Sequence, residues 1–353
     1  MSLAKVIKID PAYPKEGRLQ EAASVLAKGG LVIIPTDTVY GIAADSSNKE
    51  ALERLYSIKQ RPKDKPFSLH IDSKDRLGAF AKDISVEAYK LMDKFWPGPL
   101  TLIFKSKDKD TIGVRLPDNE IARRIILLSG APVVCPSANI SGDQPPVDFK
   151  DAIKHLGSLV DLAVDGGRKK LAKESSIVDV TVSPVRILRE GALKKEDIER
   201  VVKTKTVLFV CTGNSCRSVM AKGLLEKKLK EKKRRDIEVL SAGIMMVGGF
   251  GASLETRQLL AQEGVDASGH ISQRVTPDML NRSDIILVME RLHEERILQM
   301  APAVKKRLFL LKEFAKVNSS NLDIGDPIGK PMEVYEETFA VIKEAVEKIS
   351  GLI

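Results

Sequence analysis

The chain has 353 residues, of which 43% are hydrophobic and 30% charged, and its formal net charge is +9. These values exclude a disordered or fibrous chain, and the length favours two domains that each bury a core. The basic charge is compatible with an anionic partner such as nucleic acid, but a solvated basic surface explains it as well.

Cysteine content and hydropathy indicate where the protein resides. The three cysteines, Cys135, Cys211 and Cys216, are too few for a disulfide framework and favour a reducing compartment. No apolar run approaches the roughly 18 residues of a membrane span, and the first residues lack the apolar core of a signal peptide. We therefore expect a cytoplasmic protein with no membrane association.

The first half of the chain has an α/β pattern. Residues 17–30 have helical spacing that ends in glycine, and residues 31–41 then predict a buried strand that runs into a turn. Amphipathic helices are predicted over 49–59 and 85–95. Further apolar runs predict strands at 100–104, 131–136, 159–167, 176–182 and 185–191. Several of these strands follow one another without a helix, so we expect a twisted mixed sheet.

The pattern changes near residue 203. A polar helical segment, 194–205, is followed by a strand, a loop, a long helix and two further strands, at 206–210, 211–217, 218–235, 237–243 and 284–289. This alternation predicts a small doubly wound domain with a four-stranded parallel sheet. The expected domains are therefore residues 1–203 and 204–353.

A basic run, residues 226–235, closes the long helix of the second domain. It could bind the phosphates of a nucleic acid. The favoured interpretation is a solvated helix face whose cations lie at the negative end of the helix dipole.

The loop from Cys211 to Arg217 carries the clearest chemistry. It joins the carboxyl end of a strand to a helix N-terminus, where backbone N–H groups form a site for an anion. The same dipole is expected to lower the pKa of Cys211, and Arg217 offers a planar, bidentate donor for phosphate oxygens. A buried cysteine beside a structural arginine is the alternative. Gly213 and Asn214, which tolerate unusual dihedral angles, favour the phosphate loop.

A general acid is also required for attack on phosphorus. Asp326 precedes Pro327, and the proline restricts the backbone that carries this carboxylate. An isolated Asp-Pro pair is usually only a turn. The candidate therefore depends on the rest of the domain.

The second domain resembles the low molecular weight protein phosphatase family over nearly all of residues 204–353. The resemblance rests on "FVCTGNSCRS", "SAG", "GVDASGHISQRVTPDMLNRSDIILVME" and the late Asp-Pro, in that order. It implies that Cys211 is the nucleophile of a phosphocysteine intermediate and that Arg217 binds the phosphoryl oxygens. Asp326 would protonate the leaving group and later activate water. No metal or other cofactor is implied for this domain.

The same resemblance implies supporting roles around the loop. Ser218 would hydrogen-bond the Cys211 thiolate, and Asn214 would hold the loop shape, aided by His270. Cys216 has two open interpretations: a small packed residue, or a partner in a reversible disulfide with the nucleophile.

The expected phosphatase substrate is a phosphorylated protein, and two residues bear on its kind. Tyrosine-directed members usually have a bulky aliphatic residue at position 215 and aromatic residues after the Asp-Pro, where this chain has Ser215 and Ile328. Residues 243–253 are likewise poor in aromatic residues, although Phe250 could contact a phenol ring. A small hydroxyl residue at 215 resembles the protein-arginine phosphatase branch, and it could orient the hydrolytic water. We therefore predict that phosphoarginine is preferred to phosphotyrosine, the alternative being a tyrosine-specific enzyme.

The first domain has its own set of polar turns. "PTDTVYG" (residues 35–41) ends a strand in a hydroxyl-rich turn, and residues 59–65 place Lys59, Arg61, Lys63 and Lys65 in a proline-containing loop. Four cations without apolar periodicity favour a polyphosphate site over a helix face. Each piece alone has a structural explanation, as a turn former or a solvated cation.

Over residues 5–195 this domain resembles the YrdC-like threonylcarbamoyl-AMP synthase family. The shared motifs are "PTDTVYG", the Lys-rich loop, "WPGPLT", "GVRLPDN", "CPSANISG", "ESSIVDV" and "ILREG". The resemblance implies ATP, L-threonine and bicarbonate as substrates, with Mg²⁺ accompanying ATP. It implies that the product serves threonylcarbamoyl-adenosine formation in tRNA, which makes tRNA or tRNA-modification proteins candidate partners.

The resemblance also assigns residues. Those expected to contact ATP are Lys59, Arg61, Lys65, Thr111, Asn139 and Arg189, with Lys59 adding positive charge at the phosphates. Those expected to hold threonine are Thr38, His70, Arg115, Ser137 and Ser175.

Two alternatives belong to other functional classes. The first domain could be a non-catalytic RNA-binding module, for example for double-stranded RNA, which a steep salt dependence without ATP consumption would indicate. The second domain could bind phosphate without catalysis, although its complete Cys211, Arg217 and Asp326 set argues against this.

Overall fold

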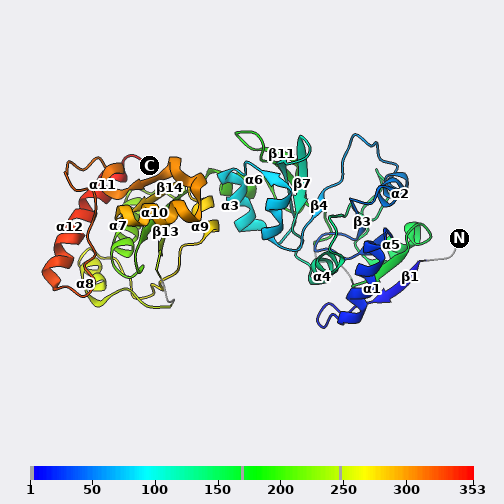
Figure 1. The fold of residues 1–353 in the computed structure, drawn as a ribbon, viewed down its shortest axis with the longest axis horizontal. Helices are drawn as coiled ribbons and strands as arrows, with labels where there is room; N and C mark the ends of the chain where they lie inside the picture. The colour runs from blue at the N-terminus through cyan, green and yellow to red at the C-terminus, as the bar shows by residue number, and fades with distance from the viewer. Residues whose placement is uncertain (1–3, 168–170, 246–248) are drawn as a thin grey trace. The chain divides into compact units, whose positions relative to one another are not determined.

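The computed structural model describes residues 4–167, 171–245 and 249–353. The chain divides into two compact units, Met1–Val201 and Val202–Ile353, and the division falls within helix α6 (Lys195–Lys203). Among the described residues, no helix combines the length and hydropathy needed to span a membrane. Figure 1 labels the elements of each unit.

The N-terminal unit is built on a mixed sheet, as predicted. In the described part of the chain its strands lie in the order β1-β9-β2-β3-β8-β4-β7-β6-β10-β11, with β5 paired to β6. The β2–β3, β3–β8 and β6–β7 pairs are antiparallel, whereas β2–β9, β4–β7 and β6–β10 are parallel. The strands are β1 (Lys5–Lys8), β2 (Val32–Ile34), β3 (Gly41–Asp45), β4 (Leu69–His70), β5 (Ala81–Lys82), β6 (Leu100–Ser106), β7 (Thr111–Arg115), β8 (Val133–Val134), β9 (Leu162–Asp165), β10 (Ser176–Asp179) and β11 (Arg186–Arg189).

Helices cover both faces of this sheet. The helices are α1 (Glu16–Ala27), α2 (Lys49–Lys59), α3 (Val86–Phe95), α4 (Glu120–Ser129) and α5 (Phe149–Leu156), with a 3-10 helix at Lys74–Ala79. One core packs α1 and α4 against β2, and a second packs α2 and α5 against the opposite face. Alternate residues of β2 serve the two cores: Val32 and Ile34 point to one and Ile33 to the other, as the twofold period of a strand requires.

The end of α2 positions the basic loop. Asn48 caps the helix N-terminus by accepting from the Ala51 N–H, and Gln60 at the C-terminus adopts a left-handed conformation with φ of 47°. This turn directs the chain out of the helix immediately after Lys59, which stays buried at its end. Arg61, Lys63 and Lys65 therefore lie in a loop, as predicted, whereas Lys59, predicted in the same loop, is the last residue of α2.

The C-terminal unit has a four-stranded, all-parallel sheet in the order β13-β12-β14-β15, which confirms the predicted doubly wound domain. Its strands are β12 (Lys205–Cys211), β13 (Ile237–Gly243), β14 (Ile285–Val288) and β15 (Leu308–Leu310). Its helices are α7 (Arg217–Glu231), α8 (Leu254–Gln262), α9 (Pro277–Arg282), α10 (Arg291–Met300), α11 (Leu311–Phe314) and α12 (Met332–Ile349), with a 3-10 helix at Pro302–Arg307.

Alternate residues of the central strand β12 pack into two hydrophobic cores. Val207, Phe209 and Cys211 face α7 and α12, while Leu208 and Val210 face the core that includes α9 and α10. Helix α12 packs against α7 and α8 (Figure 1). Because Cys211 ends the strand on the α7 side, its sulfur lies at the carboxyl edge of the sheet, where ligands bind in open α/β folds.

The basic run at the end of α7 is largely engaged in contacts within the unit. Lys227 pairs with Glu263 at 3.1 Å, Lys228 with Glu347 at 2.7 Å, and Lys232 donates to the Ser350 carbonyl at 2.8 Å. Intramolecular pairing of these cations favours the structural interpretation of the run over a phosphate-binding one.

Candidate functional sites

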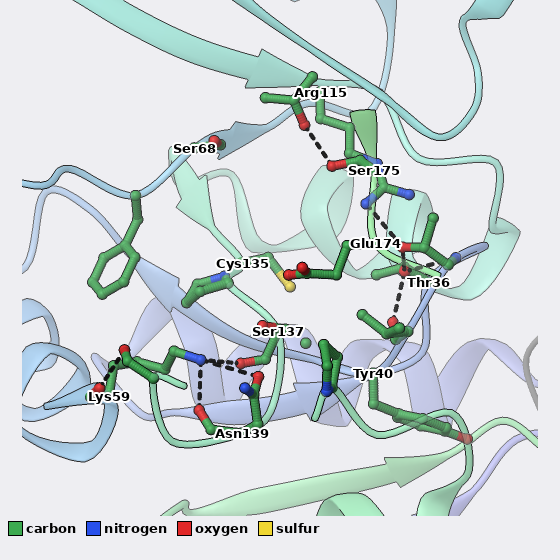
Figure 2. A pocket seen from close by; sticks show the side chains of 18 of the residues that line it. Thr36, Tyr40, Lys59, Ser68, Arg115, Cys135, Ser137, Asn139, Glu174 and Ser175 are labelled. Atoms are coloured by element: carbon green, nitrogen blue, oxygen red, sulfur yellow. Dashed lines mark hydrogen bonds between the residues drawn. The ribbon is translucent and has the colours of Figure 1, made fainter. Parts of the chain in front are cut away.

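The N-terminal unit contains a cavity of about 370 Å³, a size typical of small-molecule sites (Figure 2). Separate segments meet there because Gly41 bridges to Ser137 and β10 runs parallel to β6. Nine of the eleven residues predicted to bind ATP or threonine line it: Thr38, Lys59, Arg61, His70, Arg115, Ser137, Asn139, Ser175 and Arg189.

The two remaining predicted residues do not line the cavity. Thr111 is exposed and pairs with Lys105 at the start of β7, four residues and about 13 Å along the strand from Arg115. Lys65 contributes its backbone carbonyl, which accepts from Arg61 Nε at 2.7 Å. The structure therefore does not bring these two side chains to the others.

Arg115 is held by three protein groups. It is buried at the end of β7, and its Nη2 lies 2.5 Å from Asp37 Oδ1. Its Nη1 donates to Thr38 Oγ1 at 3.0 Å, and its Nε donates to the Gly98 carbonyl at 3.3 Å. The ion pair with Asp37 offsets the cost of burying the guanidinium.

Lys59 is saturated by protein acceptors. Its Nζ lies 2.7 Å from the Ser137 carbonyl, 2.5 Å from the Asn139 carbonyl and 3.2 Å from Asn139 Oδ1 (Figure 2). An ammonium has three hydrogens, and three acceptors surround this one. Burial lowers the Lys59 pKa to about 8. In this structure Lys59 therefore holds the 137–139 turn and lines the cavity, and its contribution of charge at the ATP phosphates stays a prediction.

Arg189 and Ser175 form a second polar cluster. Arg189 Nε donates to the Ser175 carbonyl at 2.9 Å, and its Nη1 pairs with Glu174 at 3.1 Å. The Ser175 hydroxyl is 2.9 Å from Thr101 Oγ1. Glu174 thus places a carboxylate in a cavity that four cations also line, Lys59, Arg61, Arg115 and Arg189.

His70 is buried and neutral. Burial lowers its pKa to about 3, and the nearby Arg115 charge acts in the same direction. Its Nδ1 faces the Ser68 carbonyl at 3.4 Å, whereas its buried Nε2 has no hydrogen-bond partner among the described residues. An unpaired buried nitrogen in a cavity wall is a group that a ligand can satisfy.

Sequence reasoning missed several lining residues and one important ion-pair partner. Asp37, which pairs with Arg115, was not singled out, although it lies within "PTDTVYG". The missed lining residues with polar or ionisable side chains are Thr36, Tyr40, Ser68, Thr101, Cys135, Ser141, Asp143 and Glu174. Most of them adjoin predicted residues in the quoted motifs, so proximity in sequence was the available signal.

In the C-terminal unit the predicted phosphate loop closes around the Cys211 sulfur. The sulfur is 3.0 Å from Ser218 Oγ and accepts from the Asn214 N–H at 3.3 Å. Asn214 has φ of 56°, in the left-handed region that asparagine tolerates. Its side chain bonds to Ser218 and Ser241, and its carbonyl lies 2.7 Å from His270 Nε2. The three residues predicted to support the loop, Asn214, Ser218 and His270, are thus brought together.

Arg217 is almost completely buried and faces two carboxylates. Its Nη1 donates to Glu290 Oε2 at 2.6 Å and to the Ile324 carbonyl at 2.8 Å. Its Nη2 pairs with Asp326, the predicted general acid, which confirms that the two side chains converge. Its Nε has no hydrogen-bond partner among the described residues.

Burial raises the pKa of the Cys211 thiol above its ordinary value, although the Ser218 hydrogen bond and the Arg217 charge act to lower it. The prediction that the loop lowers this pKa is therefore wrong for this structure. The physical reason is that the sulfur is nearly inaccessible to water, and this desolvation outweighs the hydrogen bonds and the Arg217 charge that act to lower the pKa.

The side chains that bear on substrate choice lie near the loop. Ser215 is partly buried, with its hydroxyl 3.5 Å from Cys216 Sγ. Phe250 and Ile328 are exposed, at 64% and 56%. Residues 246–248, part of the segment predicted to be poor in aromatic residues, lie outside the described residues. Cys216 is a free thiol that contacts Tyr335 Oη at 3.6 Å, so both interpretations of it stay open.

Three further residues of this site were missed: Thr212, Glu290 and His293. Thr212 Oγ1 is 2.9 Å from Arg217 Nη2 and 3.0 Å from His293 Nε2. Glu290 and His293 begin α10, more than 70 residues from the loop, so only the tertiary fold brings them to Arg217.

Comparisons with known proteins match each unit separately. The sequence profile of the Sua5/YciO/YrdC family, described as telomere recombination, matches residues 24–191. The profile described as low molecular weight phosphotyrosine protein phosphatase matches residues 206–351.

Individual relatives follow the same division. A threonylcarbamoyl-AMP synthase of Pyrococcus abyssi is 36% identical over 219 residues, covering 60% of this chain and 64% of the relative. The chain thus spans less than two thirds of the length of that relative. EpsP of Ralstonia solanacearum, named as a low molecular weight protein-tyrosine-phosphatase, is 36% identical over 143 residues, covering 40% of this chain and 92% of EpsP.

Among solved structures, Sua5 of P. abyssi in complex with L-threonine superposes with a TM-score of 0.54 at 26% identity, covering 86% of this chain and 99% of that one. The chain therefore belongs to the Sua5/YciO/YrdC family through its N-terminal unit and to the low molecular weight protein-tyrosine-phosphatase family through its C-terminal unit.

Proposed function

We propose that the N-terminal unit forms threonylcarbamoyl-AMP from L-threonine, bicarbonate and ATP. The observation that carries this proposal is the convergence of nine predicted ligand-binding residues on one cavity. The family relationship and the L-threonine bound to Sua5 of P. abyssi support it. The product would serve the modification of tRNA.

The proposed reaction has two steps. The threonine nitrogen attacks the bicarbonate carbon, a C–N bond forms, and a C–O bond breaks with loss of water to give the carbamate. A carbamate oxygen then attacks the α-phosphorus of ATP, and the bond to the bridging oxygen breaks to release pyrophosphate. Such chemistry depends mainly on positioning and on neutralisation of charge.

The cavity residues divide between these tasks. Arg115, with Thr38 beside it, would bind the threonine carboxylate, and the unpaired Nε2 of His70 would hydrogen-bond the amino acid. Arg61 and Arg189 would bind phosphates. The described residues hold no group of three metal-ligating side chains, so Mg²⁺ would enter with ATP, where it would neutralise the triphosphate.

The test is pyrophosphate release by the full chain, measured with and without threonine and bicarbonate. Release should require both, and Arg61→Ala should weaken it by raising the KM for ATP. Cys211→Ser, in the other unit, is the matched control and should leave the rate unchanged. Salt-sensitive binding of double-stranded RNA without ATP consumption would instead support the RNA-binding alternative.

We also propose that the C-terminal unit hydrolyses phosphorylated proteins through a phosphocysteine intermediate. The observation that carries this proposal is that one loop holds both Cys211 and Arg217, and that Asp326 pairs with Arg217. Cys211 would attack phosphorus, and Asp326 would give a proton to the leaving group. The same carboxylate would then accept a proton from the water that hydrolyses the phosphocysteine.

The proposed preference for phosphoarginine rests on Ser215. Its small side chain leaves room beside the phosphoryl group, and the exposed Ile328 provides no ring to stack on a phenol. The test for catalysis is hydrolysis of para-nitrophenyl phosphate, followed by detection of the phosphocysteine in acid-quenched protein. Cys211→Ser should abolish both signals, and retained turnover in that variant would exclude the intermediate.

A further inference from the structure

A closed set of hydrogen bonds surrounds the guanidinium of Arg217. Its Nη2 donates to Thr212 Oγ1 at 2.9 Å, and its Nη1 donates to Glu290 Oε2 at 2.6 Å. The backbone N–H of Glu290 donates to His293 Nδ1 at 3.1 Å, and His293 Nε2 lies 3.0 Å from Thr212 Oγ1. These four residues, here called the arginine ring, join the loop after β12 to the start of α10.

The arginine ring defines the tautomer of His293. Because Nδ1 accepts from the Glu290 N–H, the proton of the neutral imidazole must be on Nε2. Nε2 then donates to Thr212 Oγ1, which also accepts from Arg217. Both lone pairs of the hydroxyl are thus used, and the hydroxyl is fixed in place.

His293 remains neutral at the pH of the cell. It is fully buried, and burial together with the positive charge of Arg217 lowers its pKa to about 4, against the carboxylates of Glu290, Asp326 and Asp323, which act to raise it. A neutral donor can support Thr212 without repelling the neighbouring guanidinium.

The arginine ring leaves one edge of Arg217 available. Nη1 is occupied by Glu290 and the Ile324 carbonyl, whereas the buried Nε has no partner among the described residues. Nη2 pairs with Asp326, which must leave when it acts as an acid. Nε and Nη2 then form the two-donor edge that binds two oxygens of a phosphate.

We propose that His293 and Thr212 are positioning residues that hold Arg217 with its Nε–Nη2 edge directed to the phosphoryl group. This inference rests on the proposed phosphatase function of the C-terminal unit. The two residues act through Arg217 and need not touch the substrate. Without them, the two carboxylates and the Ile324 carbonyl would set the guanidinium orientation.

The test compares three full-length variants. His293→Asn keeps an acceptor for the Glu290 N–H but is too short to reach Thr212, and Thr212→Val removes the acceptor hydroxyl with little change in shape. Each should lower kcat/KM for para-nitrophenyl phosphate about 10-fold and weaken inhibition by inorganic phosphate. This is the low end of the range for the bond to the charged Arg217 that Thr212→Val removes, and the high end for the neutral bond that His293→Asn removes. Thr212→Ser keeps the hydroxyl and should recover most of the loss.

The double variant His293→Asn/Thr212→Val separates positioning from unrelated damage. Residues that act as one unit are not additive, so the double variant should be no worse than either single variant. Single variants with wild-type kcat/KM and wild-type phosphate affinity would overturn the inference. The inference would also be overturned if the kcat/KM losses of the two single variants multiplied in the double variant, or if the variants differed from wild type only in the melting temperature of this unit.

A second readout separates failure of the inference from failure of the proposed function. Binding of inorganic phosphate, measured by calorimetry, reports Arg217 orientation even in an inactive protein. If the wild type binds phosphate but hydrolyses nothing, the phosphatase proposal fails and the affinities still decide the role of His293. If the wild type is active and all variants bind phosphate equally, only the positioning inference fails.

Discussion

Replacement of Lys59 by methionine tests whether this buried ammonium binds ATP or positions the residues that do. The substitution preserves the length of the side chain and removes its three hydrogen bonds to Ser137 and Asn139. Hydrogen bonds to charged groups contribute about 1.5–3 kcal/mol each, and they are not additive. The lowered pKa of Lys59 shows that burial of the charge has a cost, which the variant no longer bears.

These opposing effects predict a small change in stability and a large change in activity. We expect Lys59→Met to lower the free energy of unfolding of the N-terminal unit by about 1–2 kcal/mol, because the desolvation cost offsets part of the lost hydrogen bonds. The 137–139 turn loses its anchor, and a misplacement of about 1 Å can cost about 100-fold in rate. We therefore expect kcat/KM for threonine-dependent pyrophosphate release to fall about 100-fold.

A double-mutant cycle with Asn139→Ala decides between the two roles. If Lys59 acts by holding Asn139, the combined variant should be no slower than Asn139→Ala alone. Lys63→Met is the control. Lys63 is an exposed cation of the same loop whose ion pair with Glu53 is long, at 3.7 Å, so this variant should behave as wild type. Multiplicative losses would show that Lys59 also acts outside the Asn139 side chain, since its bonds to the Ser137 and Asn139 carbonyls remain in Asn139→Ala. A loss in Lys59→Met that appears only as a higher KM for ATP, with an unchanged KM for threonine, would refute the positioning role.

Three further predictions concern single residues. His70 has a folded-state pKa of about 3, below its ordinary value of 6.5, so the unfolded state binds the proton first as the pH falls. The free energy of unfolding of the N-terminal unit should therefore decrease by about 1.4 kcal/mol per pH unit between pH 6.5 and 3. Denaturant titrations at several pH values measure this dependence, and it should be weaker in His70→Gln. Asp326→Asn should slow hydrolysis of phenyl phosphate more than that of para-nitrophenyl phosphate, because only the poorer leaving group needs the proton; equal losses in kcat would contradict its role as the acid. Wild-type protein should have a higher kcat/KM for phosphoarginine than for phosphotyrosine in matched peptides, and Ser215→Ile should shift the ratio toward phosphotyrosine; a phosphotyrosine preference that this substitution does not change would argue against the assignment.

Local features of both units could be predicted from the sequence. The strand, the loop from Cys211 to Arg217 and the helix after it are adjacent in the chain, so hydrophobic periodicity and turn residues were sufficient. Strands that follow one another without a helix predicted the mixed sheet of the first unit. The alternation of strands and helices after residue 203 predicted the parallel sheet of the second. The ordered motifs also predicted most of the cavity residues, because the motifs lie at strand or helix ends that meet at one cavity.

What these residues contact was decided only by the tertiary structure. The sequence predicted Lys59 as a cation for phosphate, but packing of α2 against the 137–139 turn surrounds it with three acceptors. It predicted a lowered pKa for Cys211, but burial of the sulfur raises that pKa, although the Arg217 charge acts to lower it. This error arises because the charge of a group depends on its access to solvent and on partners distant in the chain.

The same reasoning explains why the arginine ring could not be predicted. Thr212 and Glu290 lie within quoted motifs, Glu290 as the last residue of its motif, but His293 lies three residues beyond, with no local pattern that connects it to Thr212. A sequence records residue types and local periodicity, and these determine strands, helices and the turns between them. The distances between side chains from separate elements, and the exclusion of water around them, arise only when the sheet assembles and its helices pack on it.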